Sequence, residues 1–373
     1  MQDHAFWMRH CMELARKGAG SVSTNPMVGC VILDEQGRVL GEGYHERFGG
    51  AHAEVNAIGQ AIERHGEDVL TTATLYVNLE PCSHVGKTPP CADLILEKRI
   101  PRVVTAMPDP NPQVQGRGIA RLRTHGVDVT ENVLRAEAER LNEAFIRHMM
   151  TKRPMVFLKI AQTLDGWIAT NSGDSRWVSG EAARRMVHEW RATLDAVLIG
   201  AETARVDDPA LTVRHVAGRQ PLRVVLDRRG RLPEALQLFQ DDFVPQTVSF
   251  VNAGVSTAYA EVIHKKGGKL VYKSGENPIW GLADVLDALG SGIAGKPVQS
   301  VLVEAGPTLA TALLRENLVD RLLVFIAPKL LGSGKPAFYD LGITQMASAS
   351  TFSEFSWMPV GDDLLFTGFA PLP

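Results

Sequence analysis

The alternation of strand-like and helix-like patterns is the feature that most constrains how this chain of 373 residues can fold. Short apolar runs typical of buried strands occupy residues 27–34, 74–80 and 102–107. Amphipathic segments with helical spacing lie between them, at residues 52–65 and 92–99. Strands that alternate with helices predict an α/β fold in which helices cover a sheet.

A second round of the same alternation begins after TKRP, residues 151–154. The helical pattern of residues 134–150, which we expect to form a single helix, ends there in a polar, positive segment, and the proline opens a strand. A chain of this length has room for two or three domains of roughly 150 residues. We therefore expect two α/β domains, at residues 1–150 and 151–373, and residues 236–265 are the least legible part of the second.

Composition places the chain among ordinary globular proteins. Its 39 lysines and arginines and 42 aspartates and glutamates give a net charge of −3, whereas a dedicated nucleic-acid binder is usually basic. No apolar run approaches the roughly 18 residues of a membrane span, and the N-terminal residues mix charges into a helical pattern instead of an apolar signal core. We expect a cytoplasmic enzyme or binding protein with no nucleic-acid or membrane partner.

All four cysteines lie in the first quarter of the chain, at positions 11, 30, 82 and 91. Four cysteines in so long a chain do not make a disulfide scaffold. Cys11 and Cys30 fall within apolar patterns, so we expect them in the hydrophobic core. Any thiol chemistry therefore belongs to the first domain, at Cys82 and Cys91.

The segments AHAEVNA and NLEPCSHVGKTPPC bring together His52, Glu54, Cys82 and Cys91. One imidazole and two thiolates form a three-ligand zinc set that leaves a fourth position open for water, as in catalytic sites. Zinc-dependent base deaminases use such a set, with a nearby glutamate as general acid and base. Their general signature has two residues between the cysteines, whereas this chain has eight.

Two other interpretations of this cluster stay open. His84 could supply a fourth ligand and close the site, which would make the zinc structural. The cysteines could also be ordinary buried side chains, because isolated His-x-Glu and Pro-Cys pairs are common.

The segments HAEVNA and LEPCSHVGKTPPC, with TNPMVGCVI upstream and DPNPQVQGRG downstream, resemble the deaminase domain of the bifunctional riboflavin-biosynthesis deaminase/reductase family. The spacing of eight residues between the cysteines is the form used by this family. The resemblance implies a cytidine-deaminase-like α/β/α sandwich and deamination of a diamino-pyrimidinone that carries a ribosylamino 5′-phosphate. It implies that zinc binds His52, Cys82 and Cys91 and that Glu54 shuttles the proton. Substrate contacts are implied at Asn25, Lys87 and His84.

The second half contains two patterns that suit a nucleotide cofactor. In VLVEAGPTLATALL, residues 301–314, a strand is followed by Gly306 and a helix that Pro307 opens. The N–H groups of such a helix start suit a pyrophosphate, although an ordinary strand–turn–helix produces the same pattern. Arg228 and Arg229 follow another strand end, where an arginine can accommodate a 2′-phosphate or simply be solvated.

The segments LKIAQTLDGWIAT, SGDSRWVS, ETARVDDPALTVR and VEAGPTLATALL resemble the reductase domain of the same family. The resemblance implies a dihydrofolate-reductase-like α/β domain that uses NADPH to reduce the ribosyl group to a ribityl chain. The implied cofactor contacts are Ala161, Trp177, Thr203, Asp207, Gly306, Pro307, Thr308, Leu309, Ala310, Thr311 and Ala312. The implied substrate contacts are Ser175, Arg191, Leu211, Arg214 and Glu304.

The chemistry of these residue types fits the implied reaction. Arg191 and Arg214 are suited to a bidentate grip on the substrate phosphate. Either Glu304 or Asp207 could manage protons while NADPH delivers a hydride to the opened sugar. We expect a homo-oligomer that acts on a small phosphorylated pyrimidine. The alternatives are a nucleic-acid or nucleoside deaminase with an accessory domain, and a zinc-stabilised binding protein without activity.

Overall fold

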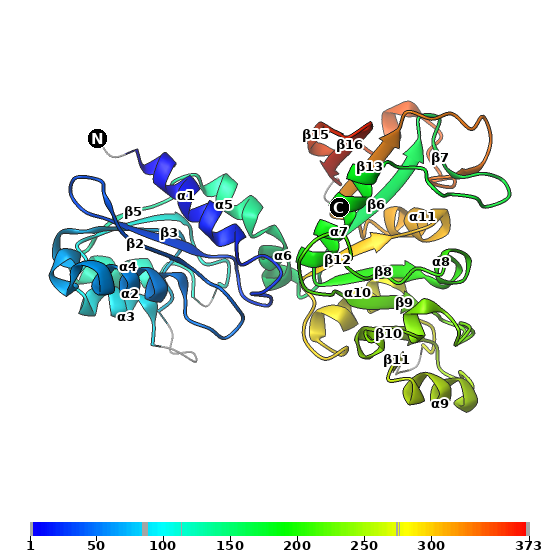
Figure 1. Ribbon diagram of the computed structural model, residues 1–373, viewed down its shortest axis with the longest axis horizontal. Coiled ribbons are helices and arrows are strands. Elements are labelled where there is room, and N and C mark those ends of the chain that lie inside the picture. The colour runs from blue at the N-terminus through cyan, green and yellow to red at the C-terminus, as the bar shows by residue number, and fades with distance from the viewer. Residues whose placement is uncertain (1–2, 84–88, 113, 274, 276, 371–373) are drawn as a thin grey trace. The chain divides into compact units, whose positions relative to one another are not determined.

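The computed structural model describes residues 3–83, 89–112, 114–273, 275 and 277–370. The chain divides into two compact units, Met1–Thr151 and Lys152–Pro373, each drawn in Figure 1 around its own sheet. Each unit has a separate hydrophobic core built on the strands and helices of that unit. The two units are described one at a time.

The first unit is built on a five-stranded sheet in the order β2-β1-β3-β4-β5. β1 is antiparallel to β2 and β3, and β3, β4 and β5 run parallel. The strands are β1 (Gly29–Leu33), β2 (Val39–Tyr44), β3 (Thr74–Leu79), β4 (Arg102–Met107) and β5 (Asp128–Thr130). The helices are α1 (His4–Arg16), α2 (Ala53–His65), η1 (Glu67–Thr72), α3 (Cys91–Glu97), α4 (Arg117–Thr124), α5 (Arg135–Leu141) and α6 (Glu143–Thr151).

Helices cover both faces of this sheet, as the apolar strands require. Every residue of β1 and β3 is buried, which is the pattern of strands with a covered face on each side. α1 and α5 lie on one face, and α2, α3 and α4 lie on the other (Figure 1). Cys11 and Cys30 are fully buried in this core, so their prediction as core residues is confirmed.

The single helix expected over residues 134–150 is wrong. The chain forms α5 and α6, which are separated at Asn142, where the backbone has φ −106° and ψ 20°. The side chain of Asn142 is buried and hydrogen-bonds to the backbone of Met27. The apolar periodicity continues through this position and therefore predicts one helix. The helix is interrupted at Asn142, whose side chain makes a tertiary contact that cannot be predicted from periodicity.

The second unit is built on a nine-stranded sheet in the order β11-β10-β9-β8-β12-β6-β13-β16-β15. The strands from β11 to β13 are parallel, and β16 and β15 continue the sheet in antiparallel fashion. These strands are β6 (Met155–Thr163), β8 (Ala196–Gly200), β9 (Leu222–Leu226), β10 (Thr247–Val251), β11 (Lys269–Tyr272), β12 (Ser300–Glu304), β13 (Arg321–Ala327), β15 (Ser353–Val360) and β16 (Asp363–Phe369). A separate antiparallel pair consists of β7 (Trp167–Ala169) and β14 (Lys335–Pro336).

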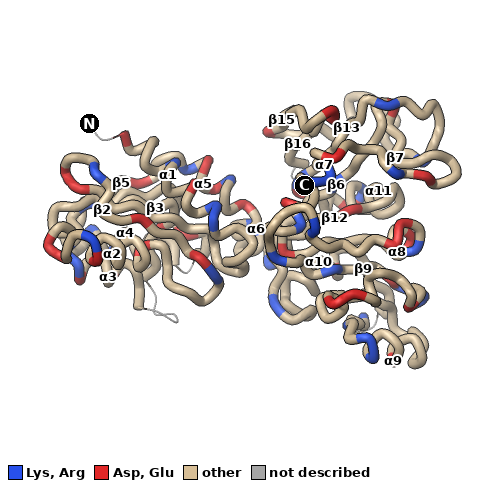
Figure 2. Tube along the Cα trace, viewed as in Figure 1, with Lys and Arg blue, Asp and Glu red and all other residues tan. Residues whose placement is uncertain are grey.

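Helices connect the parallel strands of this sheet. They are α7 (Glu181–Thr193), α8 (Ala201–Asp207), η2 (Gln237–Phe239), η3 (Val244–Gln246), α9 (Thr257–Lys265), α10 (Leu282–Ser291) and α11 (Pro307–Arg315), whereas η4 (Met346–Ser348) precedes the antiparallel strand β15. Residues 236–265, the least legible part of the sequence, contain η2, η3, β10 and α9. Among the described residues, no helix has the length and apolarity needed to cross a membrane. Figure 2 shows basic and acidic residues interspersed along both units.

Candidate active sites

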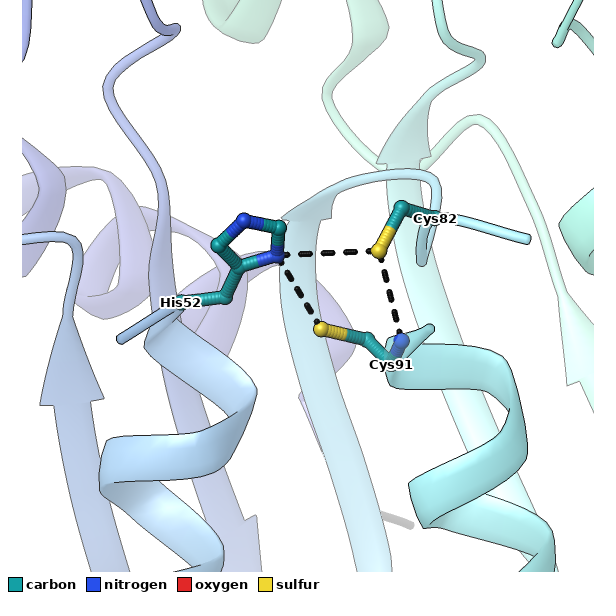
Figure 3. Close-up of side chains that lie close together, drawn as sticks. All are labelled: His52, Cys82 and Cys91. Atoms are coloured by element: carbon teal, nitrogen blue, oxygen red, sulfur yellow. Dashed lines mark hydrogen bonds between the residues drawn. The ribbon is translucent and has the colours of Figure 1, made fainter. Parts of the chain in front are cut away.

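The predicted zinc ligands lie at the ends of two helices and a strand in the first unit. His52 is the residue that precedes α2, Cys91 is the first residue of α3, and Cys82 follows the end of β3 (Figure 3). Prolines on both sides of the loop fix these ends, because Pro81 precedes one cysteine and Pro90 precedes the other. The fold therefore brings together ligands that lie up to 39 residues apart.

The distances within this cluster suit a tetrahedral metal. The Nδ1 atom of His52 lies 3.3 Å from Cys91 Sγ and 3.6 Å from Cys82 Sγ, and the three ligand atoms lie within 4.8 Å of one another. Zinc–nitrogen and zinc–sulfur bonds of about 2.0 and 2.3 Å place such atoms roughly 3.5 Å apart in a tetrahedron. The donor set of one imidazole and two thiols fits zinc.

The contacts within the cluster favour a thiolate at one of the two cysteines. The hydrogen bond from Cys91 lowers the pKa of Cys82 to about 4, helped by His52, and the same bond raises the pKa of Cys91. The backbone N–H of Cys91 also donates to Cys82 Sγ over 3.3 Å. A thiolate at position 82 is therefore stabilised at the start of α3.

Glu54 is the second residue of α2 and lies beside these ligands. Its side chain is buried, and its Oε2 atom has no hydrogen-bond partner among the described residues. Burial, followed by the nearby Cys82, raises the pKa of Glu54 to about 7. A carboxyl group in this position can accept and return a proton.

Asn25 reaches the same cluster through a histidine that sequence reasoning missed. His45 Nδ1 faces the carbonyl oxygen of Ala51 at 2.9 Å, so this nitrogen carries the hydrogen and Nε2 accepts from the Asn25 amide at 3.0 Å. The rings of His45 and His52 lie 5.7 Å apart, edge to face. The predicted contacts His84 and Lys87 lie outside the described residues.

A second residue missing from the sequence-based prediction is Glu80, which follows β3. Its buried carboxylate accepts the backbone N–H groups of Asp109, Gly116 and Gly118 at 2.9 to 3.1 Å. A Cβ atom on Gly118 would lie 2.0 Å from the carbonyl oxygen of Pro81, so only glycine allows α4 to approach the strand end that carries Cys82. The sequence LEP, residues 79–81, could have revealed Glu80, because an acidic residue at the end of a buried strand needs hydrogen-bond partners.

A cavity of about 600 Å³ lies in the second unit, at the C-terminal ends of β6, β8 and β12. Crevices at this edge of a parallel sheet are the usual ligand sites of α/β proteins. The predicted site residues that line it are Ala161, Ser175, Trp177, Arg191, Thr203, Asp207, Leu211, Arg214, Glu304, Gly306 and Pro307.

Five predicted cofactor residues do not line this cavity: Thr308, Leu309, Ala310, Thr311 and Ala312. They continue α11 away from its first turn, where Gly306 and Pro307 do reach the cavity. Ala310 belongs to the core of the unit, and the Thr311 hydroxyl accepts the backbone N–H of Tyr339. Arg228 and Arg229 are exposed beyond β9 and do not line the cavity either.

Arg191 and Glu304 form an ion pair in the cavity wall. The Nε and Nη2 atoms of Arg191 donate to the two carboxylate oxygens of Glu304 at 2.6 and 3.0 Å, and Nη1 donates to the carbonyl oxygen of Thr212. Arg191 was expected to bind the substrate phosphate through two hydrogen bonds, but in this structure it binds the Glu304 carboxylate in that way. Burial raises the pKa of Glu304, but Arg191 outweighs this effect and leaves that pKa below its usual value.

Lys159 on β6 lines the same cavity and was absent from the sequence-based prediction. Burial lowers the pKa of its amine, opposed by Glu304. Desolvation also raises the pKa of Asp207, the exposed last residue of α8. A lysine in the middle of an otherwise apolar strand was the available signal, because a buried amine is retained only with partners or a function.

His188 on α7 supports the turn that carries Arg214. Its Nδ1 atom accepts the backbone N–H of Arg214 over 3.2 Å, and its ring contacts that of His215 edge to face at 4.5 Å. Burial, together with Arg191 and His215, lowers the pKa of His188 to about 4. The ring is thus a neutral acceptor at neutral pH.

Comparison with known proteins identifies a family for each half of the chain. The family model of the cytidine and deoxycytidylate deaminase zinc-binding region matches residues 1–107, and that of the RibD C-terminal domain matches residues 154–366. The riboflavin biosynthesis protein RibD of Escherichia coli (strain K12) is 39% identical over 381 residues, covering 98% of each chain. The chain belongs to the RibD family. RibD of Actinobacillus pleuropneumoniae is also 39% identical, over 362 residues that cover 96% of this chain and 93% of that protein.

Solved RibD structures share the whole fold. Acinetobacter baumannii RibD superposes with a TM-score of 0.86 at 35% identity, covering 99% of both chains. A Thermotoga maritima protein described as a diaminohydroxyphosphoribosylaminopyrimidine deaminase/5-amino-6-(5-phosphoribosylamino)uracil reductase superposes at 0.84, with 35% identity and 99% coverage. Membership of the RibD family confirms the predicted fold class and the predicted function, a bifunctional deaminase and reductase of riboflavin biosynthesis. It also confirms the predicted cofactors, zinc for the deaminase domain and NADPH for the reductase domain.

Proposed function

We propose that the first unit removes the ring amino group of a diamino-pyrimidinone ribosylamino 5′-phosphate, and that the second unit reduces the ribosyl group of the product to ribityl with NADPH. The observation that carries the proposal is the His52, Cys82 and Cys91 cluster with Glu54 beside it. A zinc-type deaminase centre of this kind precedes a RibD C-terminal domain in the same chain. The Thermotoga maritima relative carries the names of both activities.

In the deaminase unit, His52, Cys82 and Cys91 would hold zinc. Bound zinc supplies Lewis acidity that brings the pKa of a water molecule to about 7. Glu54 Oε2 accepts the proton of the attacking water and delivers it to the amino nitrogen, which leaves as ammonia when its bond to the ring carbon breaks. Asn25 presents its amide to the ring, since His45 fixes the direction of that amide. Lys87 is also proposed to contact the substrate.

In the reductase unit, NADPH supplies the hydride that C1′ of the opened, imine-like sugar receives. Ala161, Trp177, Thr203 and Asp207 are proposed to contact the cofactor, together with Gly306 and the helix that follows. Asp207 is also proposed to exchange a proton with the substrate nitrogen, because its carboxyl group lines the cavity.

The phosphorylated substrate is proposed to occupy the other side of the cavity. The residues proposed to contact it, Ser175, Leu211, Arg214, Arg191 and Glu304, all line the cavity. Because Arg191 is already paired with Glu304, we propose that Arg214 supplies the main charge opposite the phosphate and that the ion pair fixes the cavity wall.

The test supplies purified protein with the pyrimidine phosphate and measures bound metal, ammonia and NADPH oxidation. We expect one zinc per chain, ammonia release without NADPH, and NADPH oxidation only after deamination. Ammonia from cytidine or a transfer RNA, but none from the pyrimidine phosphate, would instead favour a nucleoside or nucleic-acid deaminase. Bound zinc without either activity would favour the binding-protein alternative.

We also propose that the chain is a homo-oligomer that uses β15. This strand ends the nine-stranded sheet, and its side chains Phe355, Trp357 and Met358 are 60%, 51% and 44% exposed. An exposed apolar edge strand favours pairing with a second copy. Trp357→Lys should convert the assembly to monomers in light scattering; a wild-type monomer would contradict the proposal.

A cytoplasmic location is proposed from the state of the thiols. All four cysteines are free, and the Cys82 and Cys91 pair must stay reduced to bind metal. A reducing compartment provides that condition. Fractionation of cells that express the protein tests this location.

A further inference from the structure

The segment between α1 and β1 carries Asn25 but takes no part in the sheet at Met27. Both polar groups of the Met27 backbone are bound by side chains instead. Asn142 Oδ1 accepts the Met27 N–H over 2.8 Å, and Asn142 Nδ2 donates to the Met27 carbonyl oxygen over 3.0 Å. Asn78 Nδ2 donates to the same oxygen over 3.0 Å, while its Oδ1 accepts the Gly29 N–H over 2.7 Å.

These two asparagines form a clamp that holds one peptide in place. Asn142 is 2% exposed and Asn78 is 0% exposed, so each amide needs its partners. They approach from different elements, because Asn78 lies on β3 and Asn142 lies between α5 and α6. A carbonyl oxygen held by two donors and an N–H held by one acceptor leave Met27 little freedom to move.

The clamp is connected to the zinc-type cluster through Asn25. Asn25 lies two residues before Met27 and donates to His45 Nε2 at 3.0 Å. His45 in turn stacks edge to face with His52 at 5.7 Å. The Asn25 amide oxygen makes no hydrogen bond with the described residues, so it is available to a ligand. The position of this amide thus depends on the backbone that Asn142 and Asn78 hold.

The location of Asn142 explains why the helix breaks there. An asparagine inside a continuous helix would keep helical backbone angles, whereas here φ −106° and ψ 20° end α5. Asn142 also lies beyond residue 107, where the match to the deaminase zinc-binding region ends. The residues after that match therefore contribute to the arrangement of the site.

We propose that Asn142, acting with Asn78, is a positioning residue for deamination that sets the place of the Asn25 amide against the pyrimidine ring. The inference rests on the proposed deamination of a pyrimidine phosphate. It predicts an effect on substrate binding, because the hydrogen bonds of the clamp go to Met27 and Gly29 and not to the candidate zinc ligands or Glu54.

The test measures steady-state deamination by the full chain with Asn142→Ala. We expect KM for the pyrimidine phosphate to rise about tenfold, which corresponds to the loss of one or two well-placed hydrogen bonds. The value of kcat should change by less than about threefold. Zinc content and NADPH-dependent reduction should stay unchanged. Val129→Ala, on β5 and buried in the same unit, is the control for general destabilisation and should keep the wild-type KM.

A double-variant cycle separates positioning from simple loss of stability. If Asn142 acts through Asn25, then Asn142→Ala in an Asn25→Ala background should raise KM by less than about twofold. Additive effects, or an unchanged KM in the single variant, would overturn the inference. Wild-type protein that releases no ammonia would instead overturn the proposed function.

Asn142→Asp covers the case in which Asn142→Ala does not fold. It keeps the shape and the acceptor for the Met27 N–H, but it loses the donor to the Met27 carbonyl oxygen. We expect KM to rise by about threefold or more. A wild-type KM for this variant would equally overturn the inference.

Discussion

The first unit draws its three candidate zinc ligands from residues 52–91, whereas the second unit assembles its cavity from side chains between residues 159 and 335. The zinc-type cluster consists of a few atoms within 4.8 Å of one another, held at the ends of helices and strands. The cavity of about 600 Å³ has a buried ion pair, Arg191 with Glu304, in its wall.

This difference teaches where each site is sensitive. A metal cluster depends on a handful of donor atoms, so one substitution there should remove activity without affecting the rest of the unit. A cavity wall that holds a buried ion pair couples activity to stability, because removing one partner leaves the other charge buried and alone.

The largest expected effect comes from Glu54→Gln. Loss of the proton-carrying group should lower the rate of deamination by about 10³-fold. Zinc content should stay at one per chain, since Glu54 is not among the three ligand residues. Metal analysis and ammonia release measure these two quantities, and reduction of the separately supplied deaminated intermediate is the internal control. Unchanged ammonia release would remove Glu54 from the reaction.

A smaller loss, with a cost in stability, is expected for Glu304→Ala. Reduction should fall by about 10²-fold or more, because the ion pair that fixes the cavity wall around the substrate is lost, while ammonia release continues. The Arg191 guanidinium would lose its partner, and its side chain is only 10% exposed, so the second unit should lose about 3–5 kcal/mol of unfolding free energy. NADPH oxidation and urea unfolding measure the two effects.

The exposed glutamate at position 189 on α7 supplies the matched control. Glu189→Ala removes a surface ion pair with Arg185, which is worth less than about 1 kcal/mol. It should leave reduction and stability unchanged. Equal loss of both activities in Glu304→Ala would contradict sites that work independently.

Acid should weaken the second unit through His188. The folded state lowers the pKa of this ring to about 4, whereas an unfolded histidine has a pKa of about 6.5. Below pH 6.5 the unfolded chain therefore binds a proton that the folded chain refuses, and stability falls as the pH decreases towards 4. The expected loss is on the order of 1–3 kcal/mol, measured by urea unfolding at several pH values.

Two variants decide whether His188 is the cause of this pH dependence. His188→Gln should flatten the slope, because glutamine does not titrate. The exposed His264 on α9 is the control, and His264→Gln should keep the wild-type slope. An identical slope in all three proteins would assign the acid sensitivity to other groups.

The smallest expected effect concerns cofactor choice. If Arg228 or Arg229 binds the 2′-phosphate, then replacing both with alanine should narrow the preference for NADPH over NADH by about tenfold. Both arginines are exposed beyond β9. Lys265→Ala, another exposed charge, is the control. If the ratio of kcat/KM for NADPH to kcat/KM for NADH equals that of the wild type, neither arginine binds the 2′-phosphate.

Much of the deaminase site could be predicted from sequence because its residues form short, recognisable motifs. His52 and Glu54 are two positions apart, and the prolines beside Cys82 and Cys91 mark the ends of elements. His45 and Glu80 escaped prediction because their roles depend on contacts with Asn25 and with the loop before α4. The family resemblance supplied most of the reductase residues, since their spacing alone carries no distinctive pattern.

The sequence by itself determined the alternation of strands and helices, the division near residue 151 and the donor atoms of the zinc-type cluster. These features follow from apolar periodicity and side-chain chemistry, which are local properties of a chain. Only the tertiary structure decided that Arg191 pairs with Glu304, 113 positions away, and that Asn142 leaves its helix to hold Met27. Such pairings depend on which groups are buried face to face, and burial is set by the packing of the whole unit.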